Sequence, residues 1–138
     1  MTNAREALTG FLATNEAVLA AGLPELAVYQ ADTLESPDTR PFMVMRWLDQ
    51  IAQVGPGAVV PVEGYVYDER GDYTRGDAIV AAALNALETA DPIFGQDGQV
   101  VISQFRTRGQ GLGRGRDMFD EAWESVVIPY YFHALIRA

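Results

Sequence analysis

The 138-residue sequence contains no cysteine, no lysine and a single histidine, His133. Without cysteine, disulfides, thiolate metal sites and thiol nucleophiles are all excluded. His133 stands in the apolar run VVIPYYFHALI, and none of the serines lies in a G-x-S-x-G turn. A nucleophile needs an adjacent base to activate it, and the sequence offers no such pair. We therefore predict that the chain is not an enzyme, with no catalytic residue and no cofactor.

Long hydrophobic runs are also missing. The longest apolar stretches, Ala78–Leu84 and Val126–Ile136, are well short of the ~20 residues that span a bilayer. No basic flank precedes an apolar run, so we expect neither a secretory signal nor a membrane partner. Positive charge is scarce as well, because ten arginines stand against 19 acidic residues and give a net charge of −9. Such a surface repels duplex DNA.

The composition predicts one globular domain over residues 1–138, since 49% of the residues are hydrophobic and 21% are charged. Asn3 and Glu6 form a capping box at the start of a first helix, which Asn15 interrupts and so divides into two shorter helices. Gly22 and Pro24 end this helical region.

Five further segments are rich in aromatic and β-branched residues and are predicted to be strands. They are Leu26–Gln30, Phe42–Leu48, Ala58–Asp68, Gln99–Arg106 and Ser125–Arg137. Pro61 indicates that the third strand lies at a sheet edge or carries a bulge. A second main helix begins with a capping box of Thr74 and Asp77 and ends before Asp91–Pro92.

This order predicts an α+β fold: a mostly antiparallel sheet of about five strands, with two main helices on one face. Long loops connect them at residues 31–41 and 107–122, and loops of that length usually have a function. Met118, Phe119, Ala122 and Trp123 are spaced for one helical turn in the second loop. Four acidic residues would share one side of that helix: Asp117, Asp120, Glu121 and Glu124. We favour a solvated acidic face over a metal site, because other signals of a cation site are missing.

The run RTRGQGLGRGR, residues 106–116, contains four arginines and four glycines. It lacks the lysine of a Walker loop and the spacing of a G-x-G-x-x-G loop. Two interpretations remain: a basic loop that contacts a partner or DNA backbone, and a hairpin tip that charge keeps soluble.

The segment VYDERGDYTRGDAI, residues 66–79, combines an aromatic-rich strand, an acidic Gly-Asp-Tyr-x-Arg turn and a helix. This pattern resembles the tail terminator (neck or tail-completion) proteins of actinobacterial siphophages, and the resemblance extends loosely over most of the chain. Gly76 stands where the commoner pattern has isoleucine.

The resemblance implies a structural virion protein of the tail or neck, assembled in the host cytoplasm. Subunits of this kind form a homohexameric ring that caps the tail tube, ends its polymerisation and joins it to the head connector. The implied partners are other copies, the tail tube protein and the head–tail connector protein, and genomic DNA passes through the lumen without specific binding. The alternatives are another connector component (adaptor or stopper) and a nucleic-acid-binding module that uses the Arg/Gly run.

The candidate site residues are therefore contact residues. Asp72, Tyr73 and Arg75 are expected to fix the turn before the central helix and to face a neighbouring subunit. Two further groups are expected to be intersubunit or tube-facing arms, namely Asp38 and Arg40 in the loop Asp32–Arg40, and Arg106, Arg108, Arg114 and Arg116. Trp47 and Trp123 are core or interface anchors, with the core favoured.

Overall fold

The computed structural model describes residues 4–22, 26–30, 39–71, 73–95 and 98–137. Within these ranges it contains three helices and nine strands. The helices are α1 (Ala4–Thr14), α2 (Glu16–Ala21) and α3 (Thr74–Glu88). The strands are β1 (Ala27–Gln30), β2 (Phe42–Trp47), β3 (Ala52–Val54), β4 (Gly57–Glu69), β5 (Ile93–Phe94), β6 (Val100–Arg106), β7 (Gly113–Arg114), β8 (Met118–Asp120) and β9 (Ser125–Arg137).

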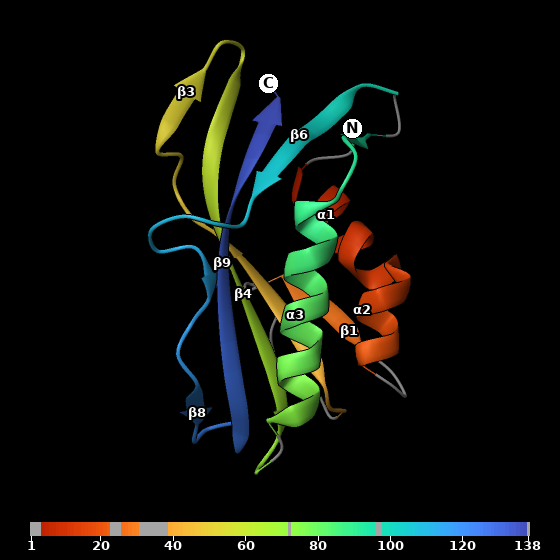
Figure 1. Cartoon of the computed structure of the whole chain (residues 1–138), viewed down its shortest axis with the longest axis vertical. Helices are drawn as coiled ribbons and strands as arrows, with labels where there is room; N and C mark the ends of the chain where they lie inside the picture. Colours follow the sequence, from red (N-terminus) through yellow and green to blue (C-terminus); the bar gives the residue numbers. More distant parts are fainter. Residues whose placement is uncertain (1–3, 23–25, 31–38, 72, 96–97, 138) are drawn as a thin grey trace.

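Two long antiparallel strands, β4 and β9, run side by side through the middle of the sheet (Figure 1). Their register extends without a break from Gly57 opposite Arg137 to Glu69 opposite Ser125. Shorter strands flank this pair: β2 and β3 lie beside β4, and β6, β7 and β8 lie beside β9. At the outer edges β1 joins β2 in parallel, and β5 joins β6. The predicted α+β class is confirmed, but the sheet is larger than the predicted mostly antiparallel sheet of about five strands, and it is mixed because β1 pairs with β2 in parallel.

Pro61 was predicted to mark a sheet edge or a bulge. The edge is wrong, because β4 is bordered on both sides, and its register with β9 passes through Pro61 without a shift. In an antiparallel strand the N–H and C=O of one residue point to the same side. The carbonyl of Pro61 accepts from the backbone N–H of Leu48, in the connection between β2 and β3. The missing N–H of Pro61 therefore falls where the neighbouring strand is interrupted, so no ladder hydrogen bond is lost.

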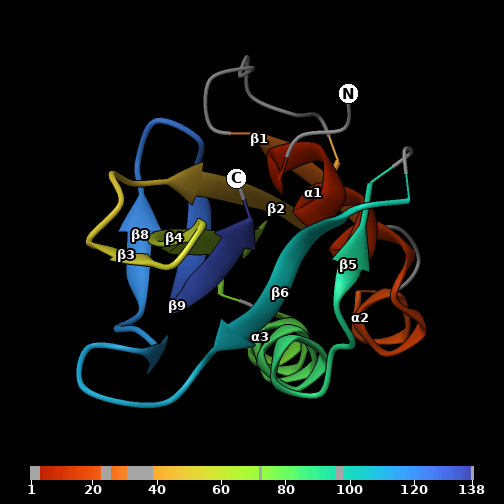
Figure 2. The same ribbon diagram turned by 90° about the horizontal axis from the view of Figure 1, so that it is seen from above.

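The three helices cover one face of the sheet (Figures 1 and 2). As predicted, Asn15 divides the N-terminal helical region: its side chain accepts hydrogen bonds from the backbone N–H groups of Ala17 (3.1 Å) and Val18 (3.2 Å) and caps α2. The proposed capping box at Asn3 lies outside the described residues. Leu8, Leu12 and Val18 are fully buried against the sheet and α3.

The start of α3 differs from the predicted capping box. Tyr73 is the N-cap and makes no side-chain capping bond, and the Asp77 carboxylate instead pairs with Arg114. Gly76 is buried, and a Cβ added there would lie 2.8 Å from Cδ1 of Ile128 on β9. The large side chain of β9 thus occupies the space that an isoleucine at position 76 would need.

The predicted helical turn between Asp117 and Glu124 is wrong. Within it, Met118–Asp120 pair with β9 as β8, after the pairing of β7 with β9 earlier in the connection, and a turn follows in which Glu124 has a positive φ of 48°. Gly115 comes close to β9: a Cβ there would lie 2.7 Å from the Tyr131 ring and 2.8 Å from Pro129. The four acidic residues of this segment therefore do not share a helix face.

Candidate assembly surface

The two faces of the sheet are covered differently. Residues that oppose each other across strands point to the same face. Met43, Val66 and Ile128 lie in register and are buried under the helices. Their neighbours along the strands therefore point to the opposite side, which we call the outer face. In Figure 2 all three helices lie on one side of the sheet, and no helix of the described residues crosses the outer face.

The outer face is hollowed by a groove of about 500 Å³ beside β8. The residues lining it come from β2, β4, β8, β9 and the turn after β8: Val44, Arg46, Tyr65, Tyr67, Met118, Phe119, Asp120, Glu121 and Val127. Met118 and Phe119 remain 45% and 40% exposed. An apolar floor with a charged rim has the composition of a protein–protein interface.

An aromatic cluster borders this groove. The rings of Phe42 and Tyr67 stack with centroids 4.7 Å apart, and the Trp123 ring lies 5.1 Å from Tyr67. The Arg40 guanidinium covers Phe42 at 4.8 Å. Trp123 therefore packs on the outer face, whereas Trp47 packs against the core under the helices, as predicted.

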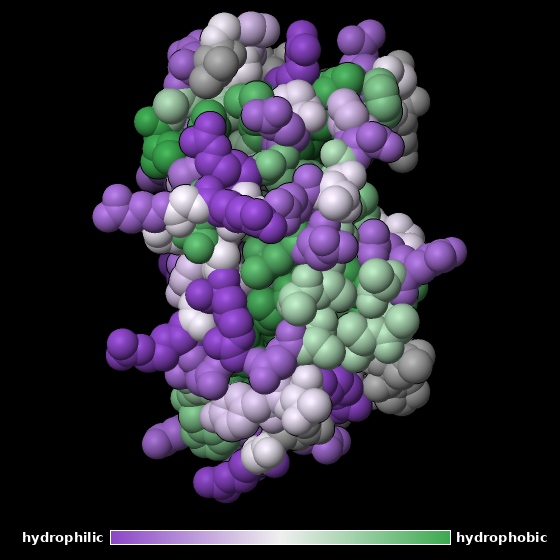
Figure 3. Space-filling view, viewed as in Figure 1, coloured by the Kyte–Doolittle hydropathy of each residue, from purple (hydrophilic) through white to green (hydrophobic). Residues whose placement is uncertain are grey.

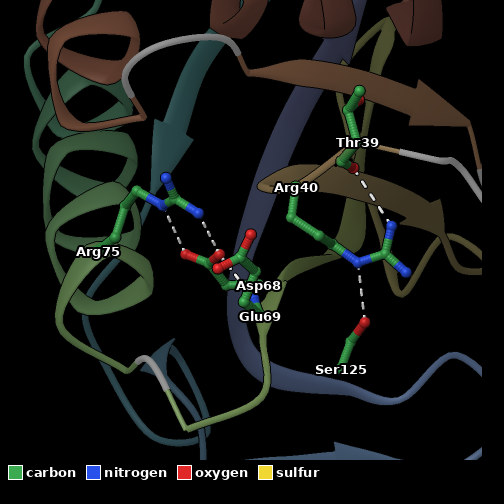
Figure 4. Close-up of polar contacts among 6 residues, drawn as sticks. All are labelled: Thr39, Arg40, Asp68, Glu69, Arg75 and Ser125. Carbon is green, nitrogen blue, oxygen red and sulfur yellow. Dashed lines mark hydrogen bonds and ion pairs between the residues drawn. The ribbon is translucent and has the colours of Figure 1, made fainter.

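Arg40, a predicted contact residue, connects the chain before β2 to the turn before β9 (Figure 4). Its Nε donates to the Ser125 hydroxyl at 2.9 Å, and one terminal nitrogen donates to the Trp123 carbonyl at 3.3 Å. Its described contacts are therefore within its own chain. Asp38, the other residue predicted in that loop, lies outside the described residues.

Arg75 extends from the first turn of α3 to Asp68 on β4 (Figure 4). Two guanidinium nitrogens donate to the Asp68 carboxylate at 2.8 and 2.5 Å, and the Asp68 side chain is 1% exposed. This bidentate pair holds the helix start on the sheet, which is the turn-fixing part of the prediction. Tyr73 is 36% exposed and remains available for the predicted intersubunit contact. Asp72 lies outside the described residues.

Two of the four arginines in the Arg/Gly run bind acidic groups of their own chain. Arg108 pairs with Glu88 at 3.1 Å, and Arg114 pairs with Asp77 and Asp117 at 2.5 and 2.7 Å. The hydrogen bonds that Arg114 donates to Asp77 and Asp117 raise the pKa of Arg114 above its ordinary value. The run is thus attached to α3 and to β9 rather than extending away from the sheet.

Arg106 and Arg116 are exposed, and neither has an acidic partner among the described residues. Arg106 lies opposite His133, where β6 pairs with β9. Of the predicted arginine contacts, these two therefore retain free guanidinium groups.

Two tyrosines of the outer face, Tyr65 and Tyr67, have raised pKa values. Burial, followed by the hydrogen bond and the charge of Glu63, raises the pKa of Tyr65 to about 12. Burial and the charge of Asp120 raise the pKa of Tyr67. A phenol with a raised pKa is a weaker acid, so both side chains keep their protons and act as packing groups.

No three His, Asp or Glu side chains gather into a metal-holding group within the described ranges. In the same ranges, no helix is long and apolar enough to cross a membrane. The absence of enzymatic activity stays a prediction.

The sequence prediction missed the groove because it expected one helical turn, from Met118 to Trp123, where the structure has β8. One signal was present: Met118 and Phe119 are adjacent apolar residues in a polar connection. Exposed apolar residues of this kind often mark a contact surface.

The sequence matches no protein-family profile and no curated protein. The structure, however, is similar to a chain of a solved particle titled "Virion of native gene transfer agent (GTA) particle". The TM-score is 0.66 at 20% sequence identity, and the match covers 99% of this chain and 96% of the other. The two chains therefore share a fold over nearly their whole lengths.

Proposed function

We propose that this chain is a structural protein of a phage-like virion, where it assembles with other virion proteins. The observation that carries the proposal is the fold match to a chain of the gene transfer agent virion, which leaves almost no part of either chain unmatched. An interface-like groove on the uncovered sheet face supports it, because a subunit of a particle needs surfaces for its neighbours.

Within this class we propose a tail terminator, which forms a hexameric ring on the tail tube, ends tube polymerisation and joins the tube to the head connector. The Gly-Asp-Tyr-x-Arg pattern in residues 66–79 supports this finer assignment. A ring requires two different patches on each subunit that meet head to tail. The groove beside β8 is one candidate patch. Leu48 and Ile51, 40% and 60% exposed before β3, form a second, and hydrophobic surface is visible around β3 in Figure 3.

The charge of the chain suits a ring through which DNA passes. A net charge of −9 disfavours tight contact with phosphates, whereas a basic lumen would retain the DNA. The alternative of a nucleic-acid module has less support, because Arg108 and Arg114 of the Arg/Gly run are neutralised by their own chain.

The test is to mix the purified protein with its tail tube protein and to image the tubes by negative stain. We expect ring-shaped caps and a narrow distribution of tube lengths. Rings that bind the head connector but leave tube length uncontrolled would assign an adaptor or stopper instead. A protein that stays monomeric in the presence of tubes and connector contradicts the proposal.

A further inference from the structure

A second, smaller recess lies on the outer face where β6 meets β9. Arg106 and His133 are direct cross-strand partners there. Together with Val59, Gln104 and Leu135 they line a cavity of about 130 Å³. The recess therefore combines a guanidinium, an imidazole and a side-chain amide with an apolar wall.

The polar groups of this recess have unused hydrogen-bonding capacity. Arg106 is exposed and has no acidic partner among the described residues, although acidic residues outnumber arginines 19 to 10. Nδ1 of His133 is buried and has no hydrogen-bond partner there. The residue that carries this buried nitrogen lies directly opposite Arg106 in the strand register, so the unpaired guanidinium is the group of this recess that is open to a partner.

We infer that this recess receives a carboxylate side chain from a second copy of the chain. A guanidinium binds a carboxylate through two parallel hydrogen bonds, and the imidazole and the Gln104 amide add further donors. Each copy carries 19 acidic residues, so a neighbour in a ring supplies the ligand. A DNA phosphate fits less well, because a chain with a net charge of −9 repels a polyanion. The inference rests on the proposed ring and names one contact within it.

The absence of lysine gives this inference a sharp test. Arg106→Lys keeps the positive charge and introduces the only side-chain amine of the protein. A zero-length carbodiimide reagent then joins that amine to any carboxylate in direct contact with it. Equal amounts of ¹⁵N-labelled and unlabelled full-length protein, assembled together on tubes, show by peptide mass spectrometry whether a link joins two copies.

We expect one dominant link from position 106 to a single Asp or Glu, with mixed isotope labels. Arg5→Lys, on the exposed side of α1, is the matched control, and its coupling gives the random background. A link at position 106 only to acidic groups of the same copy overturns the inference, as does coupling no stronger than the control.

A second variant tests the energetic role of the contact. Arg106→Gln removes the charge, and we expect it to raise the protein concentration needed for half-maximal ring formation by about tenfold or more, the usual effect of truncating one partner of a buried charged pair. Arg116→Gln, an exposed arginine that does not line the recess, should change it by less than about twofold.

The two failures are distinguishable. If the wild-type protein forms no ring under any condition, the proposed function fails. If the wild type forms rings and Arg106→Gln forms them equally well, only the recess inference fails. If the wild type instead binds a short DNA duplex that Arg106→Gln does not bind, the ligand is a phosphate and the inference is also wrong.

Discussion

The two faces of the sheet use the same strands in opposite ways. Under the helices, Val62, Val66 and Tyr130 are at most 1% exposed and close a continuous core. On the outer face the alternate residues of the same strands line a groove and a recess, and no described helix covers them. Strand alternation thus gives the two faces different side chains: one set forms the core under the helices, and the other lines the groove and the recess where we propose that partners bind. Substitutions on the two faces should therefore have different consequences.

The strongest expected effect is at Gly64, on the helix face of β4. A Cβ there would lie 2.3 Å from the Tyr130 ring, which is fully buried. Gly64→Ala should lower the free energy of unfolding by about 3 kcal/mol, because the packed ring has no space to move. Chemical denaturation measures this. Gly10→Ala, at an exposed position of α1 with no atom within 4 Å, should be neutral or slightly stabilising. Equal stability of the two variants would show that the core is not closed at Gly64.

The next effect is at the ion pair between α3 and β4. Arg75→Gln leaves the Asp68 carboxylate, 1% exposed, without its charged partner. We expect a loss of about 2 kcal/mol, because the removal of one member of a buried pair strands the other charge. Arg114→Gln breaks exposed pairs and should cost less than about 1 kcal/mol. Thermal melts of both variants measure the two losses of stability. A larger loss for Arg114→Gln would contradict the conclusion that the buried Arg75–Asp68 pair stabilises the fold more than the exposed pairs of Arg114.

On the outer face, Phe119→Ser should separate assembly from stability. The side chain is 40% exposed, so its loss should lower the free energy of unfolding by only about 1 kcal/mol. Ring formation on tubes should be strongly reduced, because the groove loses much of its apolar wall. Light scattering and negative stain measure assembly, and thermal melts measure stability. If the variant assembles normally, the groove is not part of the interface.

The smallest effect is a difference in alkaline titration. The pKa of Tyr65 is raised to about 12, so the neutral phenol is favoured in the folded state. The stability that this provides is complete below about pH 10, the ordinary pKa of tyrosine, and is lost as the pH rises through 12. Tyr65→Phe should therefore make stability less dependent on pH between 10 and 12. Ultraviolet titration of both proteins should show one fewer phenol ionising near pH 12, and an unchanged curve would contradict the raised pKa.

Local signals predicted much of the helix face correctly. Asn15 ended one helix and began another because its short polar side chain caps a helix N-terminus. The apolar spacing from Ile79 to Leu87 marked the buried side of α3. These features depend on contacts within a few residues, so the sequence alone carries them.

The outer face was predicted less well because strand pairing, and not the local spacing of apolar residues, decides its structure. Met118 and Phe119 are spaced for a helical turn, yet pairing with Val126 and Val127 of β9 makes them a strand. Likewise Pro61 on its own indicates a sheet edge or a bulge. In the structure its missing N–H donor faces the break between β2 and β3, which the sequence alone does not reveal. Arg75 was expected to fix the turn before the central helix, but its partner Asp68 could be recognised only in the folded chain.

The most direct test of the central claim is cryo-electron microscopy of tubes capped by this protein. We predict a closed ring in which the outer face, including the groove beside β8 and the recess at Arg106, is buried against neighbouring copies. A ring whose subunits meet only through α1, α2 and α3, with the outer face open to solvent, would contradict the account.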